Sequence, residues 1–171
     1  MFVAVGDYGL ILTSPDGEEW TIKFSYDKNF RGVTFGGGRF VAIGENGLTA
    51  TSTNGKEWIS ENSGLSLDGV AYGNGTFVAT NPHIIATSPD GITWTPRPII
   101  IGGASQGGYS VAFGNGLFVI GSYGQFFVSP DGVNWTRIID EGPGITDFYT
   151  GRKEEKEEGT LLTKLNNYGI G

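Results

Sequence analysis

Acidic and aromatic side chains recur in turn-rich segments of this sequence, where they could act on a ligand or bind it. Two carboxylates about 5–10 Å apart can hydrolyse a glycosidic bond, and the acids available for such a pair are Asp7, Asp27, Glu45 and Glu61. Tyrosine rings can pack flat against sugars or protein side chains. The candidate ligand-binding residues are Asp7, Tyr8, Tyr26, Glu45, Asn46, His83, Tyr123 and Gln125.

Other catalytic chemistry finds little support in the composition. The chain has no cysteine, which excludes disulfides, thiol catalysis and cysteine-ligated metals. His83 is the only histidine, so a catalytic triad is unsupported and an all-histidine metal site is impossible. We therefore expect no catalytic residue, no metal site and no cofactor.

The charge of the chain narrows the classes of partner. The net charge is −7 and the pI is about 4.6, whereas a nucleic-acid-binding protein normally carries a basic patch. No apolar stretch approaches the roughly 20 residues of a membrane helix, and the N-terminus lacks the features of a signal peptide. We expect neither nucleic acid nor a membrane as partner, and the compartment is undetermined, with cytoplasm or virion both open.

An internal repeat organises the positions of these residues. Tryptophans stand at 20, 58, 94 and 135, and a phenylalanine that opens an apolar run stands at 2, 40, 77 and 118. Both series have intervals of 36 to 41 residues. Each copy consists of short β-branched or aromatic runs bounded by turn residues, which is typical of strands. The sequence predicts an all-β fold, a small β-propeller of four four-stranded antiparallel blades, with repeats at about 2–31, 32–68, 69–108 and 109–140.

Two kinds of turn punctuate each copy. Gly73-Asn74-Gly75 suits a tight hairpin, because glycine and asparagine tolerate positive φ. Ser88-Pro89-Asp90-Gly91 suits a type I turn. In the second copy asparagine replaces this aspartate, which favours a turn-forming role over acid catalysis. The predicted structural residues are Asp16, Trp20, Asn54, Trp58, Asp90, Trp94, Asp131 and Trp135.

The Ser-Pro-Asp-Gly-x-x-Trp motif resembles the Asp-box of sialidase-like (BNR-repeat) β-propellers, with tryptophan one residue early and glycine directly after aspartate. The resemblance covers residues 2 to about 138 and implies a propeller in which the box closes the hairpin between the third and fourth strands. A sialidase is expected to carry three arginines around the substrate carboxylate. The five arginines of this chain show no such cluster, so the resemblance implies a non-catalytic member.

The first copy lacks the first strand that the other three possess. An incomplete blade would expose an unpaired edge, and residues 145–150 are a β-rich candidate to pair beside the Phe2 strand. We therefore predict a propeller domain over 1–151. The alternative is an open arc that assembles with further copies as a homo-oligomer.

Two segments depart from the repeat. The tail, residues 152–171, begins with a charged run and is either a solvated segment or a peptide that docks on a partner. The apolar crossing over Ile99–Ala104 is either additional core or an exposed interface patch.

Alternate connections of a meander fall on opposite ends of the sheet. The regular hairpin and Ser-Pro-Asp-Gly turns therefore share one face, and the variable second-to-third turns and blade crossings share the other. Binding residues tend to lie on variable loops over a rigid scaffold. We therefore predict a non-enzymatic binding or assembly module that recognises a protein or glycan through the variable face. A phage particle or a bacterial surface structure is the kind of assembly to which such a module would belong. The alternatives are a glycan-active hydrolase that uses the variable-face carboxylates, and a purely structural or engineered repeat scaffold.

Overall fold

The computed structural model describes residues 1–138, except 25–26, 98, 102–103 and 123–124. The predicted closing strand, residues 145–150, and the tail, residues 152–171, lie outside the described residues. So do the candidate residues Tyr26 and Tyr123. Among the described residues, no helix is long and apolar enough to cross a membrane.

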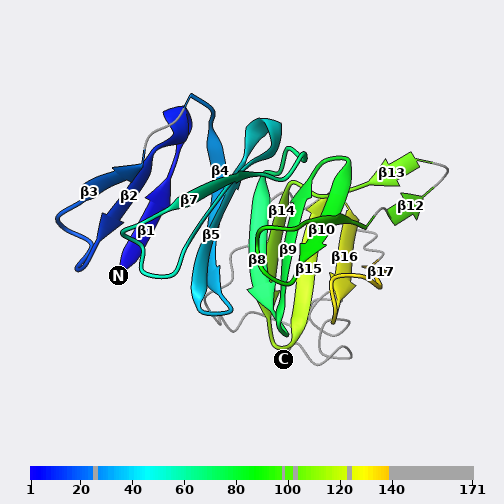
Figure 1. The fold of residues 1–171 in the computed structure, drawn as a ribbon. Coiled ribbons are helices and arrows are strands. Elements are labelled where there is room, and N and C mark those ends of the chain that lie inside the picture. The colour runs from blue at the N-terminus through cyan, green and yellow to red at the C-terminus, as the bar shows by residue number, and fades with distance from the viewer. Residues whose placement is uncertain (25–26, 98, 102–103, 123–124, 139–171) are drawn as a thin grey trace.

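Four antiparallel sheets follow one another along the chain (Figure 1). The first contains β1 (Phe2–Val5), β2 (Ile11–Ser14) and β3 (Thr21–Phe24). The second contains β4 (Phe30–Gly36), β5 (Arg39–Gly44), β6 (Leu48–Ser52) and β7 (Ile59–Asn62). The third contains β8 (Gly69–Gly73), β9 (Thr76–Asn81), β10 (Ile84–Ser88) and β11 (Thr95–Pro96). The fourth contains β14 (Ser110–Gly114), β15 (Leu117–Ser122), β16 (Gln125–Ser129) and β17 (Thr136–Ile138).

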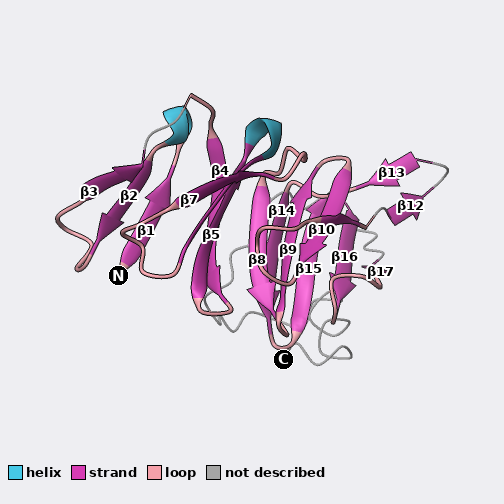
Figure 2. Ribbon diagram, viewed as in Figure 1, coloured by secondary structure: helices cyan, strands magenta, loops and turns pink. Residues whose placement is uncertain are grey.

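Each sheet is a meander, because its strands pair in chain order. The described residues contain two short 3-10 turns besides the strands, η1 (Asp7–Gly9) and η2 (Glu45–Gly47), at the same end of the first two sheets (Figure 2). Among the described residues, the first sheet has three strands where the other three blades have four, and the strand without a counterpart there is the one equivalent to β4, β8 and β14. The sequence predicted this difference.

The crossing between the third and fourth sheets contains an additional hairpin that was not predicted. Strands β12 (Ile99–Ile101) and β13 (Ala104–Gln106) pair antiparallel, with Ile99 opposite Gln106. The strands explain why this interval of the repeat is the longest. The fourth strand of the third copy begins at Thr95. Trp94 therefore stands in the turn before the strand.

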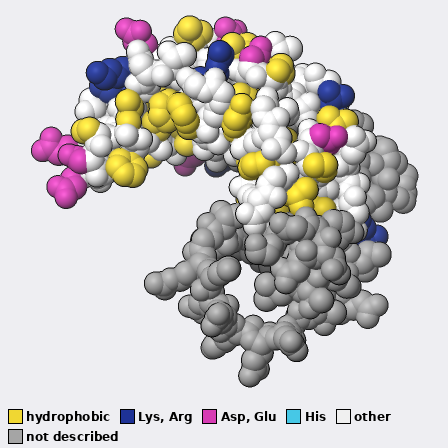
Figure 3. Space-filling model, turned by 90° about the horizontal axis from the view of Figure 1, so that it is seen from below, with side chains coloured by type: hydrophobic (Ala, Val, Ile, Leu, Met, Phe, Trp, Pro, Cys, Tyr) yellow, Lys and Arg dark blue, Asp and Glu magenta, His cyan; other side chains and the backbone are white. Residues whose placement is uncertain are grey.

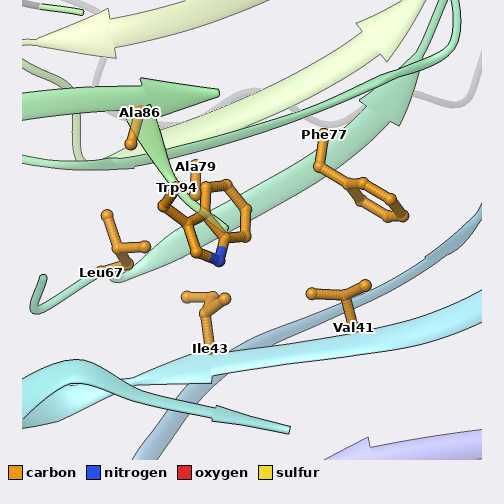
Figure 4. Packing of buried hydrophobic residues seen from close by; sticks show 7 residues of the cluster. All are labelled: Val41, Ile43, Leu67, Phe77, Ala79, Ala86 and Trp94. Atoms are coloured by element: carbon orange, nitrogen blue, oxygen red, sulfur yellow. The ribbon is translucent and has the colours of Figure 1, made fainter. Parts of the chain in front are cut away.

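The sheets pack face to face in chain order. The first strands of the second, third and fourth sheets, β4, β8 and β14, lie side by side in that order, and we call them the inner strands. Seen along the sheets, the described residues form an arc (Figure 3). The main core cluster lies between the second and third sheets (Figure 4), where Val41 and Ile43 of β5 face Phe77 and Trp94. Burial of each such apolar side chain contributes roughly 1.5–3 kcal/mol.

Each tryptophan of the last three copies packs against the preceding sheet. Trp58 lies in the cluster between the first and second sheets, Trp94 in the next and Trp135 in the one after. Trp20, in the first sheet, belongs to no core cluster of the described residues and is 42% exposed. Trp58, Trp94 and Trp135 therefore contribute to the packing between neighbouring sheets.

The hairpins between first and second strands adopt the predicted left-handed turn conformations. Asn74 and Asn115 have φ of 47° and 48°, and the glycine after each has φ near 80°. Positive φ at both central residues matches the right-handed twist of the flanking strands. These turns thus hold the register in which Tyr72 lies opposite Phe77.

Candidate functional site

The connections of the sheets divide into two faces, as predicted. We call the end with the hairpin turns and Ser-Pro-Asp-Gly boxes the turn face. There, Arg39 Nη1 donates to the carbonyl oxygen of Asp90 at 3.2 Å, and Asn74 Nδ2 donates to those of Gly116 at 3.0 Å and Pro130 at 2.8 Å. The bonds to Asp90 and Pro130 join a hairpin of one sheet to the box of the next, and the bond to Gly116 joins two neighbouring hairpins. The turn face therefore fastens the sheets to one another.

Each box holds backbone N–H groups with its serine and with an aspartate, which is replaced by asparagine in the second copy. In the fourth copy, Ser129 Oγ accepts a hydrogen bond from Gly132 N at 2.8 Å and donates to Asp131 Oδ1 at 2.9 Å. Asp131 Oδ1 also accepts from the N–H groups of Val133 and Asn134, both at 2.8 Å. The amide oxygen of Asn54 accepts two equivalent N–H bonds in the second copy.

The same bonds change the acidity of the box aspartates. Backbone hydrogen bonds, that of Glu18 first, lower the pKa of Asp16. The backbone N–H of Asn134 is the main cause that lowers the pKa of Asp131. Burial opposes the change at Asp90, but the N–H groups of Thr93 and Ile92 still lower its pKa. A carboxylate held ionised by backbone donors is a structural acceptor.

The opposite end, which we call the loop face, carries five of the predicted ligand-binding residues, Asp7, Tyr8, Glu45, Asn46 and His83. It consists of η1, η2, residues 27–29, residues 63–68 and residues 81–84. At this face the guanidinium of Arg31, a residue of β4, forms an ion pair with Glu45 and a second one with Asp7 at 3.6 Å. The hydrogen bond and charge of Glu45 raise the pKa of Arg31. Arg31 therefore joins the first two sheets at this face.

Asn29 reinforces this junction. Its Nδ2 donates to Glu45 Oε2 at 3.1 Å, and its Oδ1 accepts a hydrogen bond from the backbone N–H of Tyr8 at 2.9 Å. Tyr8 has φ of 58°, and Asn46 occupies the equivalent position of η2 with φ of 51°. The side chain of Tyr8 is 80% exposed. The loop thus holds a large aromatic residue outward on a hydrogen-bonded backbone.

A second set of bonds continues from the second sheet to the third. The backbone N–H of Asn46 donates to Ser66 Oγ at 2.8 Å, and Asn81 Nδ2 donates to the carbonyl oxygen of Ser66 at 2.6 Å. Asn81 Oδ1 in turn accepts the backbone N–H of His83 at 2.8 Å. The loops of three sheets therefore form one hydrogen-bonded surface.

Of the predicted binding residues, this surface brings together Asp7, Tyr8, Glu45, Asn46 and His83. Gln125 begins β16 in the fourth sheet, and its Oε1 is buried with no hydrogen-bond partner in the described part of the chain. Glu61 of β7 has no hydrogen bond or ion pair with these residues within the described ranges. It lines a hollow of about 230 Å³ together with Lys28, Leu48, Ser60 and Asn62.

Sequence reasoning missed Arg31, Asn29 and Asn81 as site residues. Arg31 carries a detectable signal, because it is a charged residue within an otherwise apolar strand pattern, Phe30-Arg31-Gly32-Val33. Asn29 and Asn81 carry none, since asparagine is common in turns. Within the described ranges, no three or more histidine and acidic side chains are grouped so that they could hold a metal ion.

Comparison with protein-family models found no match, and neither did comparison with curated protein sequences. Among solved structures, an ancestral GH74 enzyme superposes with a TM-score of 0.64 at 19% identity, over 82% of this chain and 22% of that enzyme. YCF48 from Cyanidioschyzon merolae superposes with a TM-score of 0.59 at 22% identity, over 82% of this chain and 52% of that protein. YCF48 bound to D1 peptide superposes with a TM-score of 0.58 at 20% identity, over 79% of this chain and 48% of that protein.

The chain thus spans between about a fifth and a half of the length of these structures. They are β-propeller proteins, and likeness at this level of identity establishes the fold. Together with the four successive sheets, the comparisons show that this chain is an all-β protein with the fold of a four-bladed β-propeller. The predicted all-β propeller class is confirmed, whereas completion of the first blade by a C-terminal strand concerns residues outside the described part of the chain.

Proposed function

We propose that the chain is a non-enzymatic binding or assembly module that recognises a protein segment through its loop face. The observation that carries the proposal is Tyr8, which is 80% exposed on a turn whose backbone is held by Asn29. Aromatic residues and arginines dominate the binding energy of protein interfaces. A rigid backbone also reduces the entropy lost on binding.

The charges around Tyr8 suit a polar peptide. Arg31 is paired with two acids yet remains 42% exposed at its side chain, and Asp7 is 65% exposed. Such groups can exchange partners with a ligand and set its orientation. YCF48, whose fold this chain shares, has been solved with a bound peptide, which is consistent with a protein partner here.

The alternative of a glycan-active hydrolase is less well supported by the loop face. Two catalytic carboxylates must flank an open space that receives the sugar. Between Asp7 and Glu45 that space is taken by the guanidinium of Arg31. The structural likeness to a GH74 enzyme and the Asp-box resemblance keep this alternative open to test. Recognition of a glycan without hydrolysis is favoured only by the exposed Tyr8 ring, which could stack on a sugar.

Three probes separate these functions on the full-length chain. A phage-displayed random peptide library, a glycan array and a panel of chromogenic glycosides would each be presented to the purified protein. We expect enrichment of a peptide family and no turnover of the glycosides. Binding restricted to glycans would replace the protein partner by a glycan, and turnover lost in Glu45→Gln would overturn the non-enzymatic proposal. Binding of none of the probes would favour a purely structural scaffold.

A further inference from the structure

A hollow of about 420 Å³ lies on the turn face, beside the first hairpin and the box of the second sheet. Figure 3 views this face, where exposed apolar side chains are visible. The volume is in the range of small-molecule sites, roughly 300–1,000 Å³. Three apolar and two polar residues line the hollow, and none of their side chains carries a charge: Met1, Phe35, Phe40, Thr53 and Asn54.

Two aromatic rings form one wall of this hollow. The rings of Phe35 in β4 and Phe40 in β5 have centroids 4.7 Å apart, and their planes are tilted by 59°. Phe35 is 57% exposed, and Phe40 is half-buried. Rings that meet at such an angle can receive a third ring in a stacked or edge-to-face arrangement. The wall therefore suits an aromatic group better than an aliphatic chain.

Met1 forms the opposite wall with an adaptable side chain. Its sulfur lies against Gly55, so closely that a Cβ at Gly55 would overlap it. In the third copy the branched side chain of Val41 fills the equivalent space over Gly91. Methionine is unbranched and polarizable, and it adjusts readily to a bound group. This wall can therefore move to fit a ligand, whereas its counterpart in the third copy is fixed.

The two polar residues of the hollow are those at which the second box differs from the other three. Thr53 and Asn54 stand where each of the other boxes has proline and aspartate. Asn54 Oδ1 accepts the N–H groups of Lys56 at 2.9 Å and Glu57 at 3.0 Å, as the box requires. Within the described ranges, Asn54 Nδ2 and the hydroxyl of Thr53 take no part in these box bonds. The second box thus places two uncharged polar groups at the edge of an apolar hollow.

We propose that this hollow binds a small, uncharged aromatic molecule that carries a hydrogen-bond acceptor. Phe35 and Phe40 contact its ring, and Asn54 Nδ2 donates to its acceptor, with the hydroxyl of Thr53 as a second donor. An aspartate at position 54 would repel the acceptor and would lose water when the ligand covered it. Because the box bonds need only one oxygen of the side chain, asparagine serves the fold and the site together. The site is separate from the loop face.

Met1 provides a direct readout, since it is the only methionine of the chain. Carbon-13 labelling of the methionine methyl group gives a single NMR signal from the wall of the hollow. The probe is coumarin, a neutral bicyclic ring with a carbonyl acceptor. We expect coumarin to shift this signal with a Kd on the order of 1 mM, as its size of about eleven non-hydrogen atoms allows. Coumarin-3-carboxylate, which adds a charge to the same ring, should bind about fivefold more weakly or less.

Two matched variants separate the hollow from the box. Thr53→Pro/Asn54→Asp gives the second box the residues of the other three, so Tm should stay within a few degrees while Kd for coumarin weakens about fivefold or more. Pro89→Thr/Asp90→Asn makes the reverse change in the third box, away from the hollow, and should leave Kd unchanged. Phe35→Ala, at an exposed position, should weaken binding as well.

Three results would overturn the proposal. Coumarin at millimolar concentration could leave the methyl signal unshifted, bind Thr53→Pro/Asn54→Asp as well as the unmodified chain, or bind no better than its carboxylate. If the double variant does not fold, Asn54→Asp alone decides the second point, because aspartate makes the same box bonds in the other copies.

Discussion

The indole Nε1 of Trp135 donates a hydrogen bond to the carbonyl oxygen of Gly132 at 3.1 Å. Trp20 and Trp58 make the same bond within their boxes. The indole Nε1 of Trp94 is buried and has no acceptor within the described part of the chain. Three of the four tryptophans therefore donate a hydrogen bond to the glycine of their own box, whereas Trp94 does not.

This difference predicts unequal effects of the same substitution. Trp135→Phe loses a hydrogen bond and should cost about 1 kcal/mol more than the change in packing alone. Trp94→Phe removes an unsatisfied buried donor, which offsets part of the lost burial. Urea unfolding of both variants checks the order, and an equal or larger loss for Trp94→Phe would contradict it.

The box aspartates should tolerate asparagine but not alanine. Asp90 Oδ1 accepts the N–H groups of Ile92 and Thr93, both at 2.9 Å, and an amide oxygen does the same at Asn54. We expect Asp90→Asn to change stability by less than about 0.5 kcal/mol and Asp90→Ala to lower it by about 1–2 kcal/mol. Thermal unfolding distinguishes them, and similar losses for both would argue against the acceptor role.

Acid should weaken the protein through these carboxylates. The pKa values of Asp16, Asp90 and Asp131 are lowered in the folded protein, so their contribution is present above the unfolded value near 3.8. It is lost as the pH falls through the folded values, when the native carboxylates must bind protons. A variant with asparagine at all three positions should lose less Tm between about pH 5 and pH 2 than the unmodified chain. Parallel curves for the two proteins would contradict this cause.

The close approach of Tyr72 to Gly36 makes this glycine intolerant of any side chain. Gly36→Ala should destabilise the protein by about 1–3 kcal/mol, because the ring or the strand must move. Gly38→Ala is a comparison in which no atom obstructs the methyl group, although its φ of 77° costs about 1 kcal/mol. The cost of Gly36→Ala, unlike that of Gly38→Ala, should fall in a Tyr72→Ala background. If denaturant unfolding shows no such coupling, the contact between the ring of Tyr72 and Gly36 is not the cause of the lost stability.

The four sheets and their turns were predictable because the same pattern of residues occurs four times in the sequence. The spacing of the repeated tryptophans and phenylalanines predicted the four sheets. The asparagine at position 54 predicted that the box acids accept hydrogen bonds from backbone N–H groups. The hairpin β12–β13 was not predictable, because it occurs once and the repeat has no second copy with which to compare it.

The candidate site was only partly predictable for a related reason. The loop positions of Asp7, Tyr8, Glu45 and Asn46 follow from the alternation of connections in a meander. Their joining by Arg31 does not, because it depends on which residue of β4 reaches the adjacent blade. Ion pairs between neighbouring blades are tertiary contacts with no signal in local spacing.

The Arg31 junction should order the loops more than it stabilises the fold. Its partners are partly exposed, and such ion pairs contribute about 0–1 kcal/mol. We expect Arg31→Gln to leave Tm within a few degrees while the amides of η1 and η2 exchange faster. Hydrogen exchange with mass spectrometry measures both loops, and unchanged exchange there would show that Asn29 alone holds them.

The affinity of a library-selected peptide for two matched variants tests the proposed loop-face recognition most directly. Tyr8→Asn removes the exposed ring but keeps a residue that tolerates the left-handed conformation, as Asn46 does at the equivalent position. Glu57→Gln removes an exposed charge from the turn face. Titration calorimetry should show Kd weakened about tenfold or more by Tyr8→Asn and unchanged by Glu57→Gln. Unchanged affinity for Tyr8→Asn, or a loss confined to Glu57→Gln, would contradict recognition through the loop face.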